Sequence, residues 1–292
     1  MDELFDAGFY EALQHFMLVS HIKINAGMSG SRKSRAKGTS VEFADFREYQ
    51  LGDDIRRIDW NAYGRMNKLF VKLFVEEREG YFTIVSDCSG SMDFGQAKKF
   101  DCSRRVAAMF AYMVLKNMDR VRLVSLQEER IKCGKSFTGN QAFAKICDEL
   151  WHYQAEGRVD LGGQVQKIPF HGSGVTFVLS DFLDQEHLEE MCRYLLYKKQ
   201  EIVLVQILSK EEYDPDWEGN KKLVGIEDGK EMRMSFSSGV LAAYHKAFDQ
   251  AERNLKQLAA RYQAGFLQIH AEEPMEIILA KAVKNGQLQQ IG

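Results

Sequence analysis

Short apolar segments alternate with amphipathic helical segments from residue 81 onward. The apolar segments have the length of strands: YFTIVSD (81–87), RVRLVSLQ (120–127), VTFVLSD (175–181), EIVLVQIL (201–208) and GFLQIH (265–270). A short further strand, IKCGKSF (131–137), is expected after the second of these. Apolar side chains recur at steps of three and four, as in helices, over residues 93–118, 139–151, 185–197 and 238–262. Strands that are apolar throughout need helices on both faces of their sheet. The alternation therefore predicts an α/β fold with a doubly wound, mainly parallel sheet.

The first 80 residues differ in pattern from the rest. Residues 2–20 have the apolar spacing of a helix, and residues 27–40 (GMSGSRKSRAKGTS) read as a basic loop. Residues 41–80 mix acids and bases with short β-like pieces such as LFVKLFV. We therefore predict an N-terminal part over residues 1–80 and an α/β domain over residues 81–292.

Polar side chains end two of the predicted strands. Asp87 ends the strand predicted over residues 81–87 and Asp181 ends the strand predicted over residues 175–181, while the loop after Asp87 adds the hydroxyls of Ser89 and Ser91. Because ligands of open α/β sheets bind beyond the carboxyl ends of the strands, these side chains are candidates for one site. A carboxylate with two hydroxyls suits Mg²⁺ or Mn²⁺. The same Asp-x-Ser-x-Ser pattern also suits a helix N-cap, so both interpretations stay open.

This loop and the segment before the first strand resemble known sequences. DCSGSM after an apolar strand resembles the metal-ion-dependent adhesion site of von Willebrand factor A-type domains. The segment EFADFREYQLGDDIRRIDWNAYGRMNKLFVKLFVEERE resembles the signature of the bacterial domain-of-unknown-function family 58, which joins it to a von Willebrand A-like domain. The matching positions are Glu42, Phe43, Arg47, Tyr49, Gly52, Asp53, Asp54, Arg56, Ile58, Asp59, Trp60 and Arg65, followed by Glu76 and Glu77.

The resemblance implies a von Willebrand A-like fold and a protein-interaction module with no established catalytic activity. It implies a MoxR-type AAA+ ATPase and a client protein complex as partners. It also implies a metal site that takes Asp87, Ser89 and Ser91 from the first loop and Asp181 from the third.

The second loop of this implied site departs from the family pattern Gly-x-Thr-x-Leu. Residues 157–161 read Gly-Arg-Val-Asp-Leu, so Val159 stands where the threonine hydroxyl would ligate. Valine has nearly the shape of threonine but lacks its oxygen. We therefore expect Mg²⁺ or Mn²⁺ to bind weakly, with water or Asp160 filling the gap.

The signature segment also has a physical interpretation of its own. Arginines alternate there with acids, and two aromatic side chains supply apolar mass, so we expect an ion-pair network around the rings. The candidate residues are Arg47, Tyr49, Asp53, Asp54, Arg56, Asp59 and Trp60. Two roles stay open: a scaffold that docks the N-terminal segment onto the α/β body, or a surface that binds the ATPase.

Two other functions stay open as alternatives. A metal-dependent phosphoryl hydrolase could use Asp87, but that chemistry needs a second Asp where the chain has Ser89. Gly134-Lys135-Ser136 imitates the end of a phosphate-binding loop, but Glu129 stands where that loop requires a glycine. The basic loop over residues 31–37 could bind nucleic acid, although no aromatic side chain lies among its basic residues.

Composition argues against further classes. The formal net charge of −3 argues against binding nucleic acid over the whole surface. The five cysteines have no CxxC spacing and indicate free thiols in a reducing compartment. No window reaches 18 consecutive apolar residues, so we predict no membrane span. The expectation is a cytoplasmic, non-enzymatic adaptor.

Overall fold

The computed structural model describes residues 4–18, 41–76, 80–128, 130–170, 172–226 and 229–290. The chain divides into a large unit, residues 1–21 with 80–292, and a small unit, residues 22–79. The N-terminal helix, which the sequence prediction grouped with residues 1–80, therefore belongs to the large unit.

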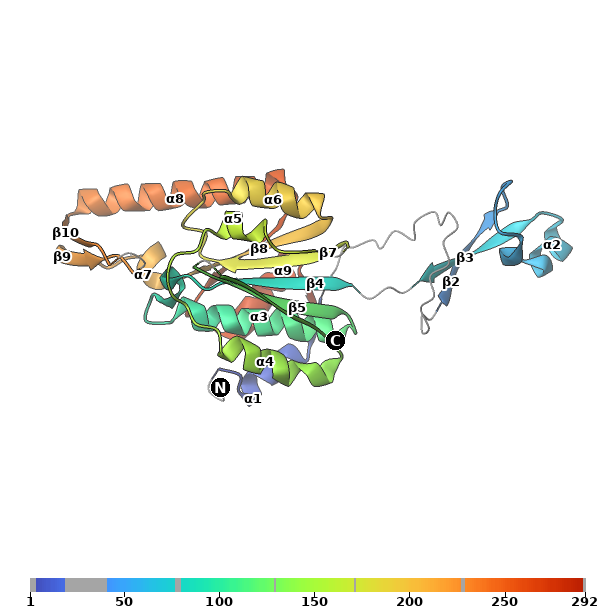
Figure 1. The fold of residues 1–292 in the computed structure, drawn as a ribbon, viewed down its shortest axis with the longest axis horizontal. Coiled ribbons are helices and arrows are strands. Elements are labelled where there is room, and N and C mark those ends of the chain that lie inside the picture. The colour runs from blue at the N-terminus through green and yellow to red at the C-terminus, as the bar shows by residue number, and fades with distance from the viewer. Residues whose placement is uncertain are drawn as a thin grey trace. The chain divides into compact units, whose positions relative to one another are not determined.

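A six-stranded sheet forms the centre of the large unit (Figure 1). Its strands, in spatial order, are β11 (Gly265–His270), β8 (Gln200–Leu208), β7 (Gly174–Ser180), β4 (Tyr81–Asp87), β5 (Arg120–Gln127) and β6 (Arg130–Thr138). Neighbouring strands pair in parallel except β5 and β6, which are antiparallel. The predicted α/β class with a mainly parallel sheet is confirmed. Because the chain runs from β4 out to β6 and returns to β7 on the other side of β4, strand order reverses between β4 and β7.

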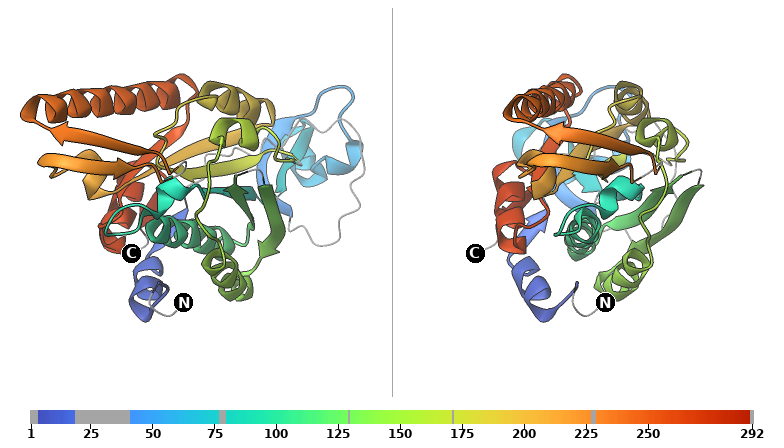
Figure 2. Two further views of the ribbon diagram at one scale, coloured as in Figure 1. Left: turned by 60° about the vertical axis from the view of Figure 1, so that its left-hand side comes forward. Right: turned by 90° about the vertical axis from the view of Figure 1, so that its left-hand side faces the viewer.

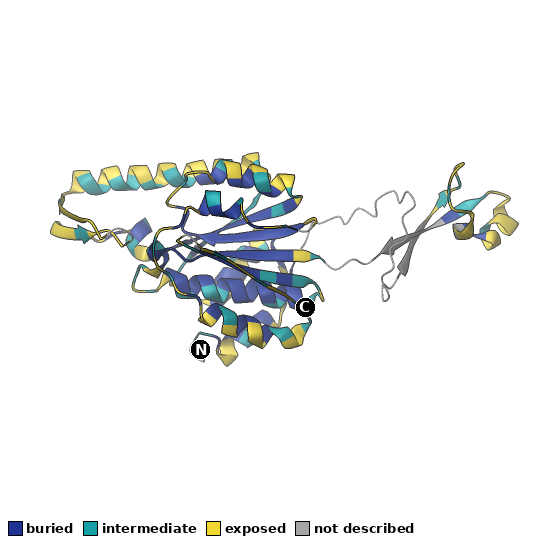
Figure 3. Ribbon diagram, viewed as in Figure 1, coloured by how far each residue is buried: buried dark blue, intermediate teal, exposed yellow. Residues whose placement is uncertain are grey.

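Helices cover both faces of this sheet (Figure 1). One face carries α3 (Lys99–Lys116), α4 (Phe143–Trp151) and α9 (Met275–Lys284), and the other carries α5 (Leu161–Val165), α6 (Leu188–Tyr197) and α8 (Ser238–Arg261). Strands β4, β5, β7 and β8 form the buried centre together with α3 (Figure 3), and every residue of β7 is buried. Within the part of the chain that the structure describes, no helix has the length and apolar character needed to cross a bilayer.

The N-terminal segment packs on the α/β body of the large unit. Helix α1 (Ala7–Leu13) buries Phe9 and Leu13. Strand β1 (Phe16–Leu18) pairs antiparallel with β12 (Leu288–Gln290), which lies near the other end of the chain. These contacts explain why the first 21 residues belong with the α/β body and not with the signature segment.

An extension that the sequence pattern did not predict lies between β8 and α8. It holds the short helix α7 (Lys210–Tyr213) and an antiparallel hairpin of β9 (Gly219–Val224) and β10 (Glu231–Phe236) (Figure 2). Ile226, in the hairpin turn, lies so near Gly90 that a side chain at position 90 would meet its methyl group at 3.2 Å. The hairpin turn therefore borders the loop that follows β4.

The small unit is built on an antiparallel pair of strands, β2 (Val41–Glu48) and β3 (Phe70–Glu76). The one-turn helix η1 (Ile55–Arg57) and helix α2 (Trp60–Met66) lie between them in the chain. Among its described side chains, the buried apolar ones are Ile58 and Val71.

Candidate functional site

The carboxyl ends of β4 and β7 meet at the point where strand order reverses, which is where ligands of open α/β sheets bind. β4 ends at Asp87, and Asp181 directly follows β7. The two strands are in register up to Ser86 and Leu179, so they end side by side. A pocket of about 180 Å³ opens there, which we call the strand-end pocket. Its lining residues are Asp87, Ser89, Ser91, Val159, Leu161, Ser180, Asp181, Leu183 and Asp184.

Asp87 is buried, and both of its carboxylate oxygens accept hydrogen bonds. Oδ1 accepts from the Ser89 amide at 2.9 Å, and Oδ2 accepts from the Ser180 hydroxyl at 2.6 Å. Burial and the nearby charge of Asp181 raise the pKa of Asp87 to about 6, although these hydrogen bonds oppose the rise. Asp87 is therefore a carboxylate whose negative charge is costly in the folded protein.

Ser89 and Ser91, the two serines that the sequence predicted for the site, lie together in the loop after β4. The Oγ atoms of Ser89 and Ser91 are 3.0 Å apart. The one-turn helix η2 (Gly90–Asp93) shapes this loop, and the Gly90 amide donates to the Gly157 carbonyl at 2.8 Å. This bond ties the first loop of the site to the second.

Asp181 is held by a buried lysine that the sequence pattern did not single out. Lys99, the first residue of α3, donates to Oδ2 of Asp181 at 2.7 Å and to Oε1 of Glu212 at 2.5 Å. Burial alone would lower the pKa of Lys99, but the two carboxylates outweigh it and raise the pKa, so the side chain carries its charge. No feature of the sequence distinguishes Lys99 from Lys98, which is exposed.

The second loop places Val159 in the pocket but leaves Asp160 outside its lining. Val159 is buried and presents methyl groups where the family pattern has a hydroxyl. Asp160 caps α5 by accepting from the Gly163 amide at 2.9 Å, and it pairs with His187 at 3.2 Å. Asp184, which the sequence pattern did not select, lines the pocket instead. The signal that could have found it is its place in the loop after the strand predicted over residues 175–181.

The oxygens of the pocket fit a weakly held, largely hydrated Mg²⁺ or Mn²⁺. Asp87, Ser89 and Ser91 offer hard ligands from one loop. The second loop offers none, and Asp181 already pairs with Lys99. Among the described residues, no three His, Cys, Asp or Glu side chains are grouped to hold an ion. The metal therefore stays a prediction.

The acids of the signature segment mainly cap turns and helices. Asp53 pairs with Arg47 at 2.7 Å. Asp54 caps η1 by accepting from the Arg56 amide at 3.0 Å, and Asp59 caps α2 by accepting from two backbone amides. The structure thus explains the spacing of these acids by local backbone capping as much as by ion pairing.

The aromatic residues of this segment differ in exposure. Trp60 is 64% exposed and packs edge-on against Tyr63, with ring centroids 6.3 Å apart. Tyr49 is half-buried. As the first residue of α2, Trp60 lies on the surface of the small unit.

Two other features of the chain, the Cys88 thiol near the pocket and the Gly134-Lys135-Ser136 motif, could suggest a different chemistry. Burial raises the pKa of the Cys88 thiol far above its usual range, which disfavours a thiolate nucleophile. Residues 134–136 lie within β6 and not in a loop between a strand and a helix, so they form no phosphate cradle. The basic loop over residues 31–37 lies outside the described residues.

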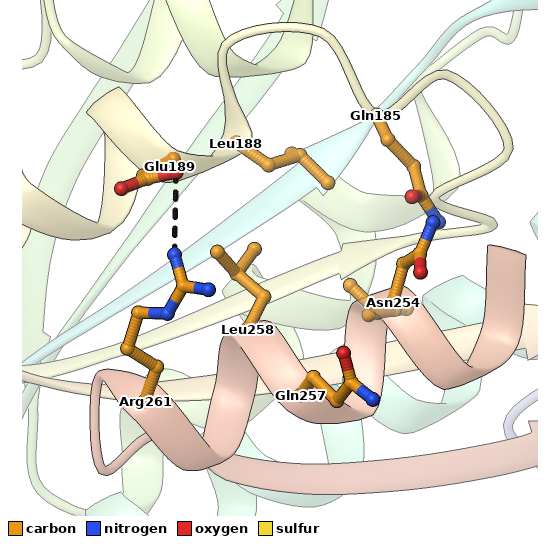
Figure 4. A pocket seen from close by; sticks show the side chains of 8 residues that line it. Gln185, Leu188, Glu189, Asn254, Gln257, Leu258 and Arg261 are labelled. Carbon is orange, nitrogen blue, oxygen red and sulfur yellow. Dashed lines mark ion pairs between the residues drawn. The ribbon is translucent and has the colours of Figure 1, made fainter.

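A second hollow, of about 250 Å³, lies between α6 and α8 (Figure 4). The side chains labelled in that view are Gln185, Leu188, Glu189, Asn254, Gln257, Leu258 and Arg261. Arg261 and Glu189 form an ion pair at 3.5 Å. A lining of amides, aliphatic groups and one ion pair offers neither a nucleophile nor a group of metal ligands, so the strand-end pocket is the stronger candidate.

Residues 45–254 match the family described as "Protein of unknown function DUF58". The chain belongs to the DUF58 family. It is 24% identical over 225 residues to the uncharacterized proteins Mb1516 of Mycobacterium bovis and Rv1480 of Mycobacterium tuberculosis, covering 75% of this chain and 71% of each relative. The predicted family is confirmed, and the mainly parallel α/β sheet described above agrees with the fold class that the sequence predicted.

Solved structures similar to this DUF58 protein share little sequence with it. The hypothetical protein BatB from Bacteroides thetaiotaomicron matches with a TM-score of 0.42 and 12% identity, over 70% of this chain and 99% of that one. The SpRpn10 VWA domain matches with a TM-score of 0.43 and 10% identity, over 72% of this chain and 98% of that one.

In this DUF58 protein, we predict that Asp87→Asn stabilises the metal-free fold at neutral pH. The folded state holds the pKa of Asp87 at about 6, against an ordinary value of 3.8, so ionisation of Asp87 disfavours folding. The neutral amide removes a penalty of at most about 3 kcal/mol. In urea unfolding with EDTA, the advantage of the variant should be full above pH 6 and vanish toward pH 3.8. A variant less stable than wild type at every pH would contradict this.

Proposed function

We propose that this DUF58 protein is a non-enzymatic adaptor that engages a partner protein through the strand-end pocket. The observation that carries the proposal is that Asp181 lines one pocket with Asp87, Ser89 and Ser91, from which it is distant in sequence, at the reversal of strand order. The von Willebrand A-like fold and the membership of the DUF58 family support an interaction module.

The size of the pocket favours a protein side chain over a small-molecule substrate. Its volume is about 180 Å³, whereas sites for small organic molecules usually measure ~300–1,000 Å³. Leu183 lines the pocket and Ile226 lies beside its first loop, and each is about half exposed. Together they offer apolar surface that a partner would cover.

The hydrogen bonds of the pocket support a binding role over a catalytic one. A serine nucleophile needs an adjacent base, but Ser89 Oγ pairs with the hydroxyl of Ser91. Asp87 has both oxygens engaged by the Ser89 amide and the Ser180 hydroxyl. These contacts fix the polar groups in place and leave none of them activated for attack.

A divalent cation is part of the proposal. Asp87, Ser89 and Ser91 would hold Mg²⁺ or Mn²⁺, and the ion would supply an electrophilic centre for a carboxylate of the partner. Because the ion needs the ionised form of Asp87, its affinity should fall below about pH 6.

The partner that we propose is a MoxR-type AAA+ ATPase, acting on a client protein complex. The support for this choice is the resemblance of the signature segment to family 58. We also propose a cytoplasmic location, supported by the cysteines: all five are free, and four of them are buried thiols.

The proposal predicts that Asp87→Ala weakens retention of the purified ATPase at least about tenfold in a pull-down with Mg²⁺. The reason is that the variant removes a buried carboxylate that lines the pocket. The matched control is Asp93→Ala, which removes an exposed carboxylate from the same loop and should retain the ATPase like wild type. Equal retention by wild type and Asp87→Ala would contradict the pocket as the interface. If Asp87→Ala weakens retention of the ATPase equally in Mg²⁺ and in EDTA, the pocket is still the interface, but the ion takes no part in the contact.

A second prediction concerns the oxygen ligand that the second loop lacks because Val159 replaces the threonine of the family pattern. Val159→Thr places a hydroxyl where the pocket now presents a methyl group, so Mg²⁺ should bind about tenfold more tightly, a gain of about 1.4 kcal/mol. Thermal melting in a Mg²⁺ titration should show the midpoint shifted to lower concentration. Val159→Ala, which removes methyl groups without adding an oxygen, is the control and should show no such shift. Identical titrations of the two variants would count against ligation at this position.

A further inference from the structure

Lys99 carries a charge inside the body of the protein beside the strand-end pocket. Its exposure is 0%, and among the described residues it is the only buried lysine. The preceding Lys98 has 46% of its side chain exposed and pairs with Asp93. A buried ammonium requires specific partners, because an unpaired charge in the interior is strongly unfavourable.

The partners of Lys99 are two carboxylates from different elements. Its ammonium donates to Asp181, at the end of β7, at 2.7 Å and to Glu212, in α7, at 2.5 Å. The second oxygen of Asp181 accepts from the Leu183 amide at 3.1 Å, and that of Glu212 accepts from the Ser209 amide at 2.9 Å. Every oxygen of both carboxylates is thus satisfied without an added ion.

We infer that Lys99 is the built-in cation of the strand-end pocket. Its ammonium occupies the position beside Asp181 that a divalent ion would otherwise take. Lys99 thereby keeps the affinity of the pocket for divalent ions low. An entering ion would have to draw Asp181 away from Lys99 or bind close to a like charge. The inference deepens the proposed function and rests on it, since it concerns the affinity of the same pocket for the proposed ion.

The test measures Mn²⁺ binding by calorimetry to wild type and to Lys99→Met/Glu212→Gln. This double variant removes one charge of each sign, and its amide side chain can still accept from the Ser209 amide. Asp181 then keeps a free oxygen and no ammonium beside it. We expect Mn²⁺ to bind at least about tenfold more tightly than to wild type.

The matched control is Lys98→Met/Glu211→Gln, which removes the same two charges one residue away, outside the buried cluster. Its Mn²⁺ affinity should stay within about twofold of wild type, because exposed charges are screened by solvent. Binding by Lys99→Met/Glu212→Gln that is no tighter than binding by wild type would overturn the inference. So would an equal gain in the control.

A folding readout covers the case in which the buried variant is unfolded in EDTA. Circular dichroism is then followed while Mn²⁺ is added: recovery of the helical signal at millimolar Mn²⁺ supports the inference, and a chain that stays unfolded overturns it. The pull-down with the ATPase is scored separately. A tenfold gain in Mn²⁺ affinity without retention of the ATPase would support the role of Lys99 and contradict the proposed function.

Discussion

The parallel pairing of β4 with β7 is the constraint on which the candidate site depends. The pairing ends both strands at one edge of the sheet, so Asp87 and Asp181 must share a small volume although the chain makes two further strands between them. Two carboxylates held this close raise the free energy of the ionised state. The Ser180 hydroxyl, the loop amides and the Lys99 ammonium are the groups with which the fold compensates for that charge.

This compensation links the pocket to the extension between β8 and α8. Lys99 joins Asp181 to Glu212 of α7, and the Glu212 carbonyl accepts from the Tyr244 hydroxyl of α8 at 2.7 Å. The β9–β10 hairpin lies between these two helices in the chain, and its Ile226 borders the first loop of the pocket. The charge balance of the pocket and the position of the hairpin are therefore parts of one packed arrangement.

The sequence predicted the features that depend on local pattern. Apolar strands identified the sheet, and strand-end polarity identified Asp87 and Asp181. Lys99 could not be predicted, because its partner Glu212 lies 113 residues away and Lys98 has the same side chain. The hairpin was missed because its exposed strands lack an apolar run. The N-terminal segment was grouped wrongly because the pairing of β1 with β12 joins distant parts of the chain.

The central claim is that a partner binds over the strand-end pocket. The most direct measurement is amide hydrogen exchange of this DUF58 protein with and without the purified ATPase. The account predicts slower exchange on binding in the loops over residues 88–93 and 182–186, which carry the pocket-lining serines and Asp184. Slower exchange confined to residues 41–76, with the pocket loops unchanged, would contradict the claim and identify the small unit as the interface.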